Sequence, residues 1–333
     1  MNIAMPQSTQ AVLRTNPVKS SRRQAMGRMG ALGGAFLAWS FLGDAFAQSA
    51  STPDAIAEMR KMMAATPPVP TKLAEGLHLI AGPGGNIGVF TWPEGKLAID
   101  SGVAGASDAI LLQMDSFGPQ PLRILINTHW HYDHTDGNEA FRKKGALIVS
   151  HENVRNRMSS AQYIDFFHAH IPASPSSALP ESTFPSSTSF NLGTEEIRVT
   201  HVPPAHTDGD SFIQFVNANV VHTGDLGFNG FYPFIDYSTG GKVDGMIAGV
   251  NKVLTICNNA TKIIPGHGPV MTTAELKQYR DMLVDVAERV RKLKKQGRDV
   301  AGVVAAKPTA KYDENHKGFF TPDQFATIVY SSL

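Results

Sequence analysis

The chain has 333 residues, of which 42% are hydrophobic, so it is long enough to bury one large core or two smaller ones and is expected to be globular. Its 30 Lys and Arg nearly balance its 29 Asp and Glu, which argues against a nucleic-acid partner, since such a partner needs a basic face, and favours a small-molecule substrate. Cys257 is the only cysteine, which excludes an intramolecular disulfide and a thiolate zinc cluster.

Residues 1–47 are expected to form a signal peptide. Two arginines at 22–23 precede an apolar stretch at 29–42, and Ala45 and Ala47 supply small side chains for cleavage after position 47. The paired arginines resemble the twin-arginine export signal, although Ala25 stands where that signal prefers an aromatic residue. The general secretion route stays open as an alternative. Export by either machinery would give a periplasmic or secreted protein.

The apolar stretch at 29–42 is too short for a transmembrane anchor. A membrane span needs about 20 apolar residues, and glycines interrupt this stretch. We therefore expect no stable membrane anchor after cleavage. The mature chain would carry 25 basic and 28 acidic residues, which makes it mildly acidic.

Residues 48–71 are expected to form an N-terminal helix and a linker. Apolar residues recur at helical spacing from Thr52 to Thr66, and two prolines at 67–68 then end the helix. The catalytic domain is expected to span residues 72–270.

The domain opens with short β-rich runs separated by turns of Gly and Pro, which predict consecutive antiparallel strands. These runs lie at 77–80, 87–90 and 97–99. A helical pattern at 107–117 then leads into a buried-strand pattern at 122–126.

Residues 158–190 interrupt this alternation with aromatic residues, histidines, prolines and serines, and we expect an inserted lid or surface loop there. Residues 271–333 are expected to form C-terminal helices that pack on the same domain, including an amphipathic helix at 274–295. Between these two parts, strand patterns lie at 196–202, 211–216, 220–222 and 262–264, and a helical pattern lies at 242–256.

Potential metal ligands follow several of these strand patterns. Four of them fall within six residues directly after the strand at 122–126, and three more stand beside or near glycines at later strand ends. Imidazoles and carboxylates suit Zn²⁺, and seven ligands are too many for one tetrahedral ion, so the sequence predicts two adjacent metals. The seven residues are His129, His131, Asp133, His134, His206, Asp225 and His267.

This order of ligands resembles the metallo-β-lactamase superfamily, in its glyoxalase II and lactonase-like branch, over about residues 72–270. The resemblance implies an α/β fold, a four-layer αββα sandwich with the metals along one edge. It also implies a dinuclear metal-dependent hydrolase with two Zn²⁺ ions, or Fe or Mn in their place. The first ion would be held by His129, His131 and His206 and the second by Asp133, His134 and His267, with Asp225 bridging the two.

The resemblance implies hydrolysis of an ester-like carbonyl, in a lactone, a thioester or a β-lactam. A metal-bridging hydroxide would attack the carbonyl carbon, and Asp133 would orient it or accept a proton. Metallo-β-lactamases proper usually carry Cys or Ser in place of Asp225, so the metal motif does not itself imply β-lactam turnover. Two alternatives remain open: hydrolysis of organophosphate triesters, and a persulfide dioxygenase with one iron held by His129, His131 and Asp225.

Four other residues are candidate substrate contacts, and each has a plainer structural alternative. An asparagine after two glycines can face the substrate or complete a tight turn. Aromatic residues after the bridging aspartate can form a substrate wall or pack in the core. A histidine in the 158–190 segment can line the pocket or lie on the surface. The four are Asn86, Phe228, Tyr232 and His168.

His222 and Thr223 directly precede Gly224 and Asp225. Partners of metal ligands commonly orient them, so either side chain is a candidate hydrogen-bond donor to the bridging carboxylate. The alternative is that both residues simply end a strand.

Overall fold

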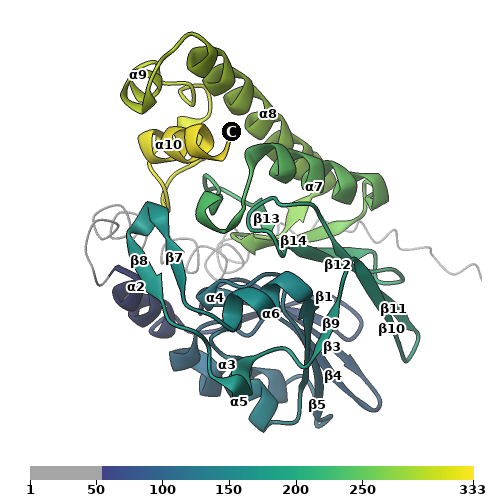
Figure 1. The fold of residues 1–333 in the computed structure, drawn as a ribbon. Helices are drawn as coiled ribbons and strands as arrows, with labels where there is room; N and C mark the ends of the chain where they lie inside the picture. The colour runs from purple at the N-terminus through teal and green to yellow at the C-terminus, as the bar shows by residue number, and fades with distance from the viewer. Residues whose placement is uncertain (1–54) are drawn as a thin grey trace, which may run out of the picture. The chain divides into compact units, whose positions relative to one another are not determined.

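The computed structural model describes residues 55–333, so the expected signal peptide and the first residues of the expected N-terminal helix lie outside the described residues. Two main β-sheets form the inner layers, and helices cover their outer faces (Figure 1). This arrangement confirms the predicted αββα sandwich. The first sheet has the order β1 (Val69–Ala74), β2 (Leu77–Ala81), β3 (Ile87–Trp92), β4 (Gly95–Ile99), β5 (Leu122–Ile126), β6 (Leu147–His151) and β9 (Ser182–Phe184).

The second sheet is built from the later part of the chain, drawn in green in Figure 1. Its strands β10 to β13 are antiparallel neighbours, whereas β13 and β14 are parallel and are connected through a helix. The order is β10 (Ser187–Leu192), β11 (Glu195–His201), β12 (Ser211–Phe215), β13 (Val220–Phe228), β14 (Lys262–His267) and β15 (Met271–Thr272).

The predicted strands of the first sheet pair as expected. β2, β3 and β4 are antiparallel, and β4, β5 and β6 are parallel, with α3 (Ser107–Asp115) and α5 (Asn138–Lys143) in the connections. A further strand, β1, begins at the end of the expected linker and lies at the edge of the sheet. Pro70 lies within β1, and an edge strand tolerates proline because one side of its backbone needs no ladder hydrogen bonds.

Residues 158–190 are not one inserted loop, which corrects the expectation. β7 (Gln162–Ile164) and β8 (Ala169–Ile171) form a separate two-stranded hairpin. However, β9 pairs with β6, and β10 pairs with β11, so the segment also supplies strands to both main sheets. Serines and prolines obscured the alternation of these short strands, and their pairing partners decide their structure.

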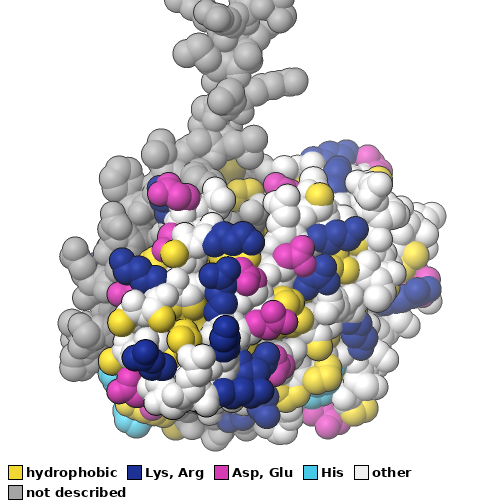
Figure 2. Space-filling view, turned by 90° about the horizontal axis from the view of Figure 1, so that it is seen from above, with side chains coloured by type: hydrophobic (Ala, Val, Ile, Leu, Met, Phe, Trp, Pro, Cys, Tyr) yellow, Lys and Arg dark blue, Asp and Glu magenta, His cyan; other side chains and the backbone are white. Residues whose placement is uncertain are grey.

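Helices α7 (Val243–Ile256) and α8 (Thr273–Lys295) cover the second sheet. α8 begins with a capping box, in which Thr272 Oγ1 accepts from the Glu275 amide and the Glu275 carboxylate accepts from the Thr272 amide. One side of α8 is apolar and buried. Lys and Arg gather on the face shown in Figure 2, with acidic side chains among them. Arg291 of α8 forms an ion pair with Asp244 of α7. α9 (Val300–Ala305) and α10 (Pro322–Ser332) complete the chain.

Apolar side chains from both sheets form the core between them, among them Leu97, Ile126, Ile197, Phe215 and Ile264, each fully buried. This core holds the two sheets together, so the ends of β5, β13 and β14 stay close to one another. The described residues form three further α-helices: α2 (Ala55–Ala64), α4 (Tyr132–Thr135) and α6 (Glu152–Met158). Within residues 55–333, no helix combines the length and apolar character of a membrane span.

Candidate metal centre

The segment 129–134 follows β5 through a bend at 128–130 and then makes one helical turn. His131 has extended dihedral angles (φ −61°, ψ 147°), and α4 follows it directly. The bend brings His129 and His131 to the same site, with their ring centroids 4.9 Å apart. The helical turn then directs Asp133 and His134 toward the same region, and the polar atoms of this short segment converge.

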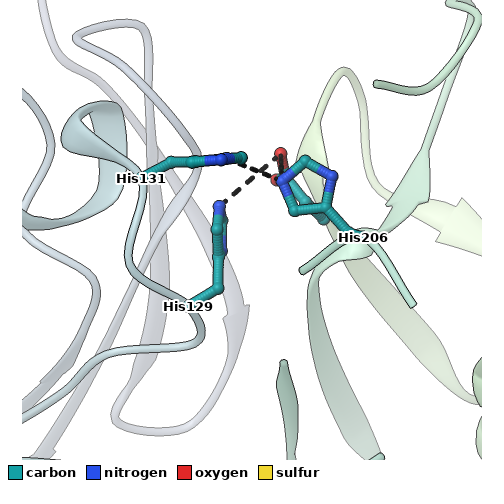
Figure 3. Close-up of side chains that lie close together, drawn as sticks. His129, His131 and His206 are labelled. Atoms are coloured by element: carbon teal, nitrogen blue, oxygen red, sulfur yellow. Dashed lines mark hydrogen bonds and ion pairs between the residues drawn. The ribbon is translucent and has the colours of Figure 1, made fainter. Parts of the chain in front are cut away.

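The first group of potential ligands consists of four residues whose ligand atoms all lie within 4.8 Å of one another: His129, His131, His206 and Asp225. His206 comes from the loop between β11 and β12, and its Nε2 lies 2.8 Å from Nδ1 of His131. Figure 3 shows His129 and His131 converging from one side of the site and His206 from the other. The two halves of the sandwich therefore both contribute to this group.

The second group consists of Asp133, His134 and His267. His267 lies at the end of β14, and its Nε2 is 3.3 Å from Nε2 of His134 and 3.2 Å from Oδ2 of Asp133. All three residues are buried. This group could hold a second ion.

Asp225 lies between the two groups. Its Oδ1 is 3.2 Å from Nε2 of His134, and its Oδ2 is 3.4 Å from Nε2 of His206 and 3.5 Å from Nε2 of His267. Gly224 precedes it at φ 52°, within an irregular stretch of β13 that aims the carboxylate at the site. A carboxylate in this position can be shared by two ions.

The donor set fits metal ions better than it fits an ordinary hydrogen-bond network. Nε2 of His129 is buried and has no hydrogen-bond partner among residues 55–333, and it lies 3.9 Å from Oδ2 of Asp225. A buried polar atom without a partner is costly unless something else satisfies it. A metal ion bound to the first group would satisfy this nitrogen.

Asp100, which the sequence analysis did not select, orients ligands of both groups. Its Oδ2 accepts from Nδ1 of His134 at 2.8 Å and from Oγ1 of Thr128 at 2.8 Å. Oγ1 of Thr128 in turn lies 3.0 Å from Nδ1 of His129, so it accepts that proton when Nε2 of His129 faces the metal. Asp100 has φ 62° and is fully buried, which marks it as a strained functional position. Its place directly after β4 was a usable signal, because the ligands also follow strands.

A carboxylate and a backbone carbonyl orient the two remaining imidazoles of the first ligand group. Oδ2 of Asp236 lies 3.0 Å from Nε2 of His131, so this histidine presents Nδ1 to the site. The Phe234 carbonyl accepts from Nδ1 of His206 at 2.8 Å, so that histidine presents Nε2. Asp236 lies in an irregular loop without a motif, and the sequence offers no signal for its role.

Burial and neighbouring charges shift the titration of the site. Burial holds the pKa of His129 well below its ordinary value and lowers the pKa of His206 to about 4, so both are neutral at pH 7, the form that binds metals. Burial also disfavours charge on His267, but Asp225 and Asp133 outweigh it and raise its pKa to about 9. For Asp225, burial raises the pKa, yet the surrounding imidazoles hold it well below its usual range.

A mainly apolar cavity opens beside the ligands. Phe228 lines it, as expected of a substrate wall, and its ring stacks on His267 with centroids 5.3 Å apart. Phe234, another of the aromatic residues that follow the bridging aspartate, also lines the cavity. Several further apolar residues were not selected from the sequence: Met59, Met63, Tyr132, Ile164, Phe167 and Phe319.

The other three candidate substrate contacts lie elsewhere. Asn86 uses its side-chain amide to donate to the carbonyls of Pro265 and Gly268 at 2.8 Å, so it joins two loops. Tyr232 is fully buried, and its hydroxyl donates to Asp313. His168 is exposed, and its Nδ1 lies 3.4 Å from the Tyr163 hydroxyl. Within the described residues 55–333, none of these three side chains is part of the cavity lining.

His222 and Thr223 support the backbone near Asp225 but not its carboxylate. His222 accepts from the Gly224 amide through Nδ1 and lies 3.0 Å from the Asn86 carbonyl through Nε2. The Thr223 hydroxyl donates toward the carbonyls of Gly224 and Ile264. Both side chains therefore hold the irregular strand in place, and this corrects the expectation of a direct bond to the carboxylate.

Two relatives are similar in sequence to parts of this chain. A probable metallo-hydrolase of Methanocaldococcus jannaschii is 26% identical over 181 residues, which cover 53% of this chain and 84% of that protein. A hydroxyacylglutathione hydrolase of Pelagibacter ubique is 26% identical over 113 residues, which cover 32% of this chain and 37% of that protein. The chain thus spans little more than a third of the second relative.

Solved structures share the fold at low sequence identity. A metallo-beta-lactamase from Pontibacter korlensis has a TM-score of 0.55 at 18% identity, covering 66% of this chain and 99% of its own. An inverting sec-alkylsulfatase from Pseudomonas sp. has a TM-score of 0.59 at 15% identity, covering 88% of this chain and 54% of its own. At these identities the likeness concerns the fold alone.

A family model matches residues 81–288, which include most strands of both sheets and all seven potential ligands. The match, the sandwich and the two ligand groups agree with one another. The chain belongs to the metallo-beta-lactamase superfamily of metallo-hydrolases.

Proposed function

We propose that this protein is a dinuclear zinc hydrolase that cleaves an ester-like carbonyl, in a lactone, a thioester or a β-lactam. The position of Asp225 carries the proposal, because its carboxylate lies within 3.5 Å of imidazoles from both ligand groups. Seven imidazole and carboxylate ligands exceed the needs of one tetrahedral zinc. A shared carboxylate also offsets the repulsion between two nearby dications.

Two bound zinc ions would supply Lewis acidity and a water activated at neutral pH. The chain itself would then provide ligand orientation, through Asp100 and Asp236, and a proton acceptor. We assign that role to Oδ1 of Asp133, because Oδ2 is turned toward His267 while the residue lines the cavity. The apolar wall that includes Phe228 would exclude water around the substrate.

The test combines metal analysis with a substrate panel. Elemental mass spectrometry of the purified chain beginning at residue 48 would give the metal content. The panel would contain lactones, thioesters, β-lactams and phosphotriesters at matched concentrations. About two zinc ions per chain with turnover of a carbonyl substrate is the expected result.

Two other outcomes would replace the proposal. Turnover of phosphotriesters alone would reassign the same centre to organophosphate hydrolysis. About one iron per chain, with oxygen consumed in the presence of a persulfide, would reassign the site to oxidative chemistry. An Asp133→Asn variant that keeps its metals and its turnover would remove the proton-accepting role from that residue.

We also propose that the protein is exported to the periplasm or beyond by the twin-arginine or the general route. The paired arginines, the short apolar stretch and the small residues Ala45 and Ala47 support this proposal. Fractionation of cells, followed by N-terminal sequencing of the mature protein, tests it. A full-length cytoplasmic protein would overturn it.

A further inference from the structure

Part of the cavity wall comes from outside the family-matched residues 81–288. Helix α2 precedes this range, yet Met59 and Met63 line the cavity beside the ligands. The two residues are one helical turn apart, so they share a face of α2, and each is only 2% exposed. Phe319, beyond the other end of the range, also lines the cavity.

Helix α2 is fixed to the segment that carries two of the ligands. Arg60 donates from Nε to Oδ2 of Asp136 at 2.6 Å and from a terminal nitrogen to Oδ1 at 3.2 Å, which is a bidentate ion pair. Its guanidinium also lies 4.5 Å from the centre of the Tyr132 ring. Tyr132 and Asp136 flank Asp133 and His134 in sequence. The position of Met59 and Met63 is therefore tied to the position of the ligands.

Away from the ligands, the cavity offers an anionic substrate group no cationic partner from residues 55–333, since none of the lining residues in this range is Lys or Arg. The nearest arginine of α2, Arg60, is already paired with Asp136. A carboxylate buried against methionine and phenylalanine side chains loses its hydration without gaining a partner, which disfavours binding.

We infer that Met59 and Met63 make α2 a specificity wall that selects uncharged substrates with an apolar group beside the reacting carbonyl. The inference rests on the proposed hydrolase function and narrows its substrate class. It disfavours β-lactam antibiotics and glutathione thioesters, because both carry carboxylates near the reacting group. It favours neutral esters and lactones.

The inference is tested by measuring the preference between a neutral and an anionic ester before and after a positive charge is added to the wall. The probes are 4-nitrophenyl butyrate and 4-nitrophenyl hemisuccinate, which differ mainly in one terminal carboxylate. The wild-type chain is expected to have a higher kcat/KM for butyrate, by roughly tenfold or more. Met63→Lys is expected to reduce or invert that ratio, because its ammonium would pair with the hemisuccinate carboxylate.

Two controls separate the wall from general damage. Ala57→Lys introduces the same charge on the exposed side of α2, and it is expected to keep the wild-type ratio. Met59→Phe narrows the cavity without adding charge, and it is expected to raise KM for butyrate while leaving the preference for the neutral ester. Metal content and thermal unfolding of every variant are measured alongside.

A binding measurement keeps the inference independent of turnover. Butyranilide and succinanilate, amide counterparts of the two esters, are titrated into the metal-loaded protein by calorimetry. Tighter binding of butyranilide, weakened in Met63→Lys but not in Ala57→Lys, supports the wall even if no ester is hydrolysed. Ester turnover with equal preference for both esters, unchanged in correctly folded Met63→Lys, would overturn the wall while leaving the hydrolase proposal intact.

Discussion

Replacing Asp100 with asparagine is expected to weaken metal binding at both ligand groups. The side chain of Asp100 accepts from Nδ1 of His134 and from Oγ1 of Thr128 through one oxygen, and from the Thr128 amide through the other. Asparagine has a single acceptor oxygen. If that oxygen keeps the backbone amide, the new NH₂ faces Nδ1–H of His134, donor against donor. The imidazole then loses the partner that holds its proton away from the metal-facing Nε2.

The magnitude follows from the number of ligands affected. Loss of one such partner typically lowers metal affinity about 10- to 100-fold, which is about 1.4–2.7 kcal/mol. His134 is affected directly, and His129 is affected through Thr128, so both groups weaken. The metal-free fold should also lose about 1–3 kcal/mol, because a buried imidazole N–H is left without an acceptor.

Chelator competition with a metal-sensitive dye measures the affinity of each site, and urea unfolding of the metal-free protein measures stability. Asp313→Asn serves as the control, since Asp313 also accepts a hydrogen bond, from Tyr232 at 2.7 Å, but contacts no ligand. The reasoning about Asp100 would be refuted by affinities at both sites that match those of the wild type and of the control.

Three further predictions concern the same centre. Asp225→Ala should lower metal content and turnover together, because it removes a carboxylate that lies within 3.4 Å of imidazoles from both groups; full activity with two metals retained would contradict this. Metal affinity should rise from pH 6.5 to 8.5, by up to about tenfold per pH unit for each displaced proton. The reason is that His267, with its pKa raised to about 9, is protonated in the metal-free site, and this proton competes less with the metal as the pH rises. An affinity that does not change with pH in chelator competition would contradict this prediction. Gly85→Ala should lower metal affinity at the second group, because its Cβ would overlap Cε1 of His134 and displace that ring, whereas Gly302→Ala in α9 should not; equal metal content in both variants would rule out the displacement.

Most of the fold could be predicted from local patterns. The runs predicted as strands at 77–80, 87–90, 97–99 and 122–126 are strands at nearly those positions. A strand that is buried on one or both faces has a recognisable pattern of apolar residues in its sequence. The sequences of the short strands β9 and β10 show no such clear apolar pattern. They are stabilised by pairing with β6 and β11, which lie elsewhere in the chain.

The seven ligand positions were visible in the sequence because metal chemistry restricts the residue types and because strand ends converge in this fold. Four of the seven lie within six residues, which is itself a local signal. The residues that orient those ligands carried less information. Asp100 contacts His134 across 34 positions and Asp236 contacts His131 across 105, and carboxylates at such separations resemble any other carboxylate in the sequence.

The sequence by itself therefore determined the architecture and singled out the seven potential ligands, because apolar periodicity and ligand chemistry are properties of short segments. Only the tertiary structure decided which carboxylates hold the imidazoles, that Tyr232 and Asn86 lie away from the cavity, and that Met59 lies in its wall. These outcomes depend on packing between distant segments, where contact is set by the positions of whole helices and strands and not by the residues next in sequence.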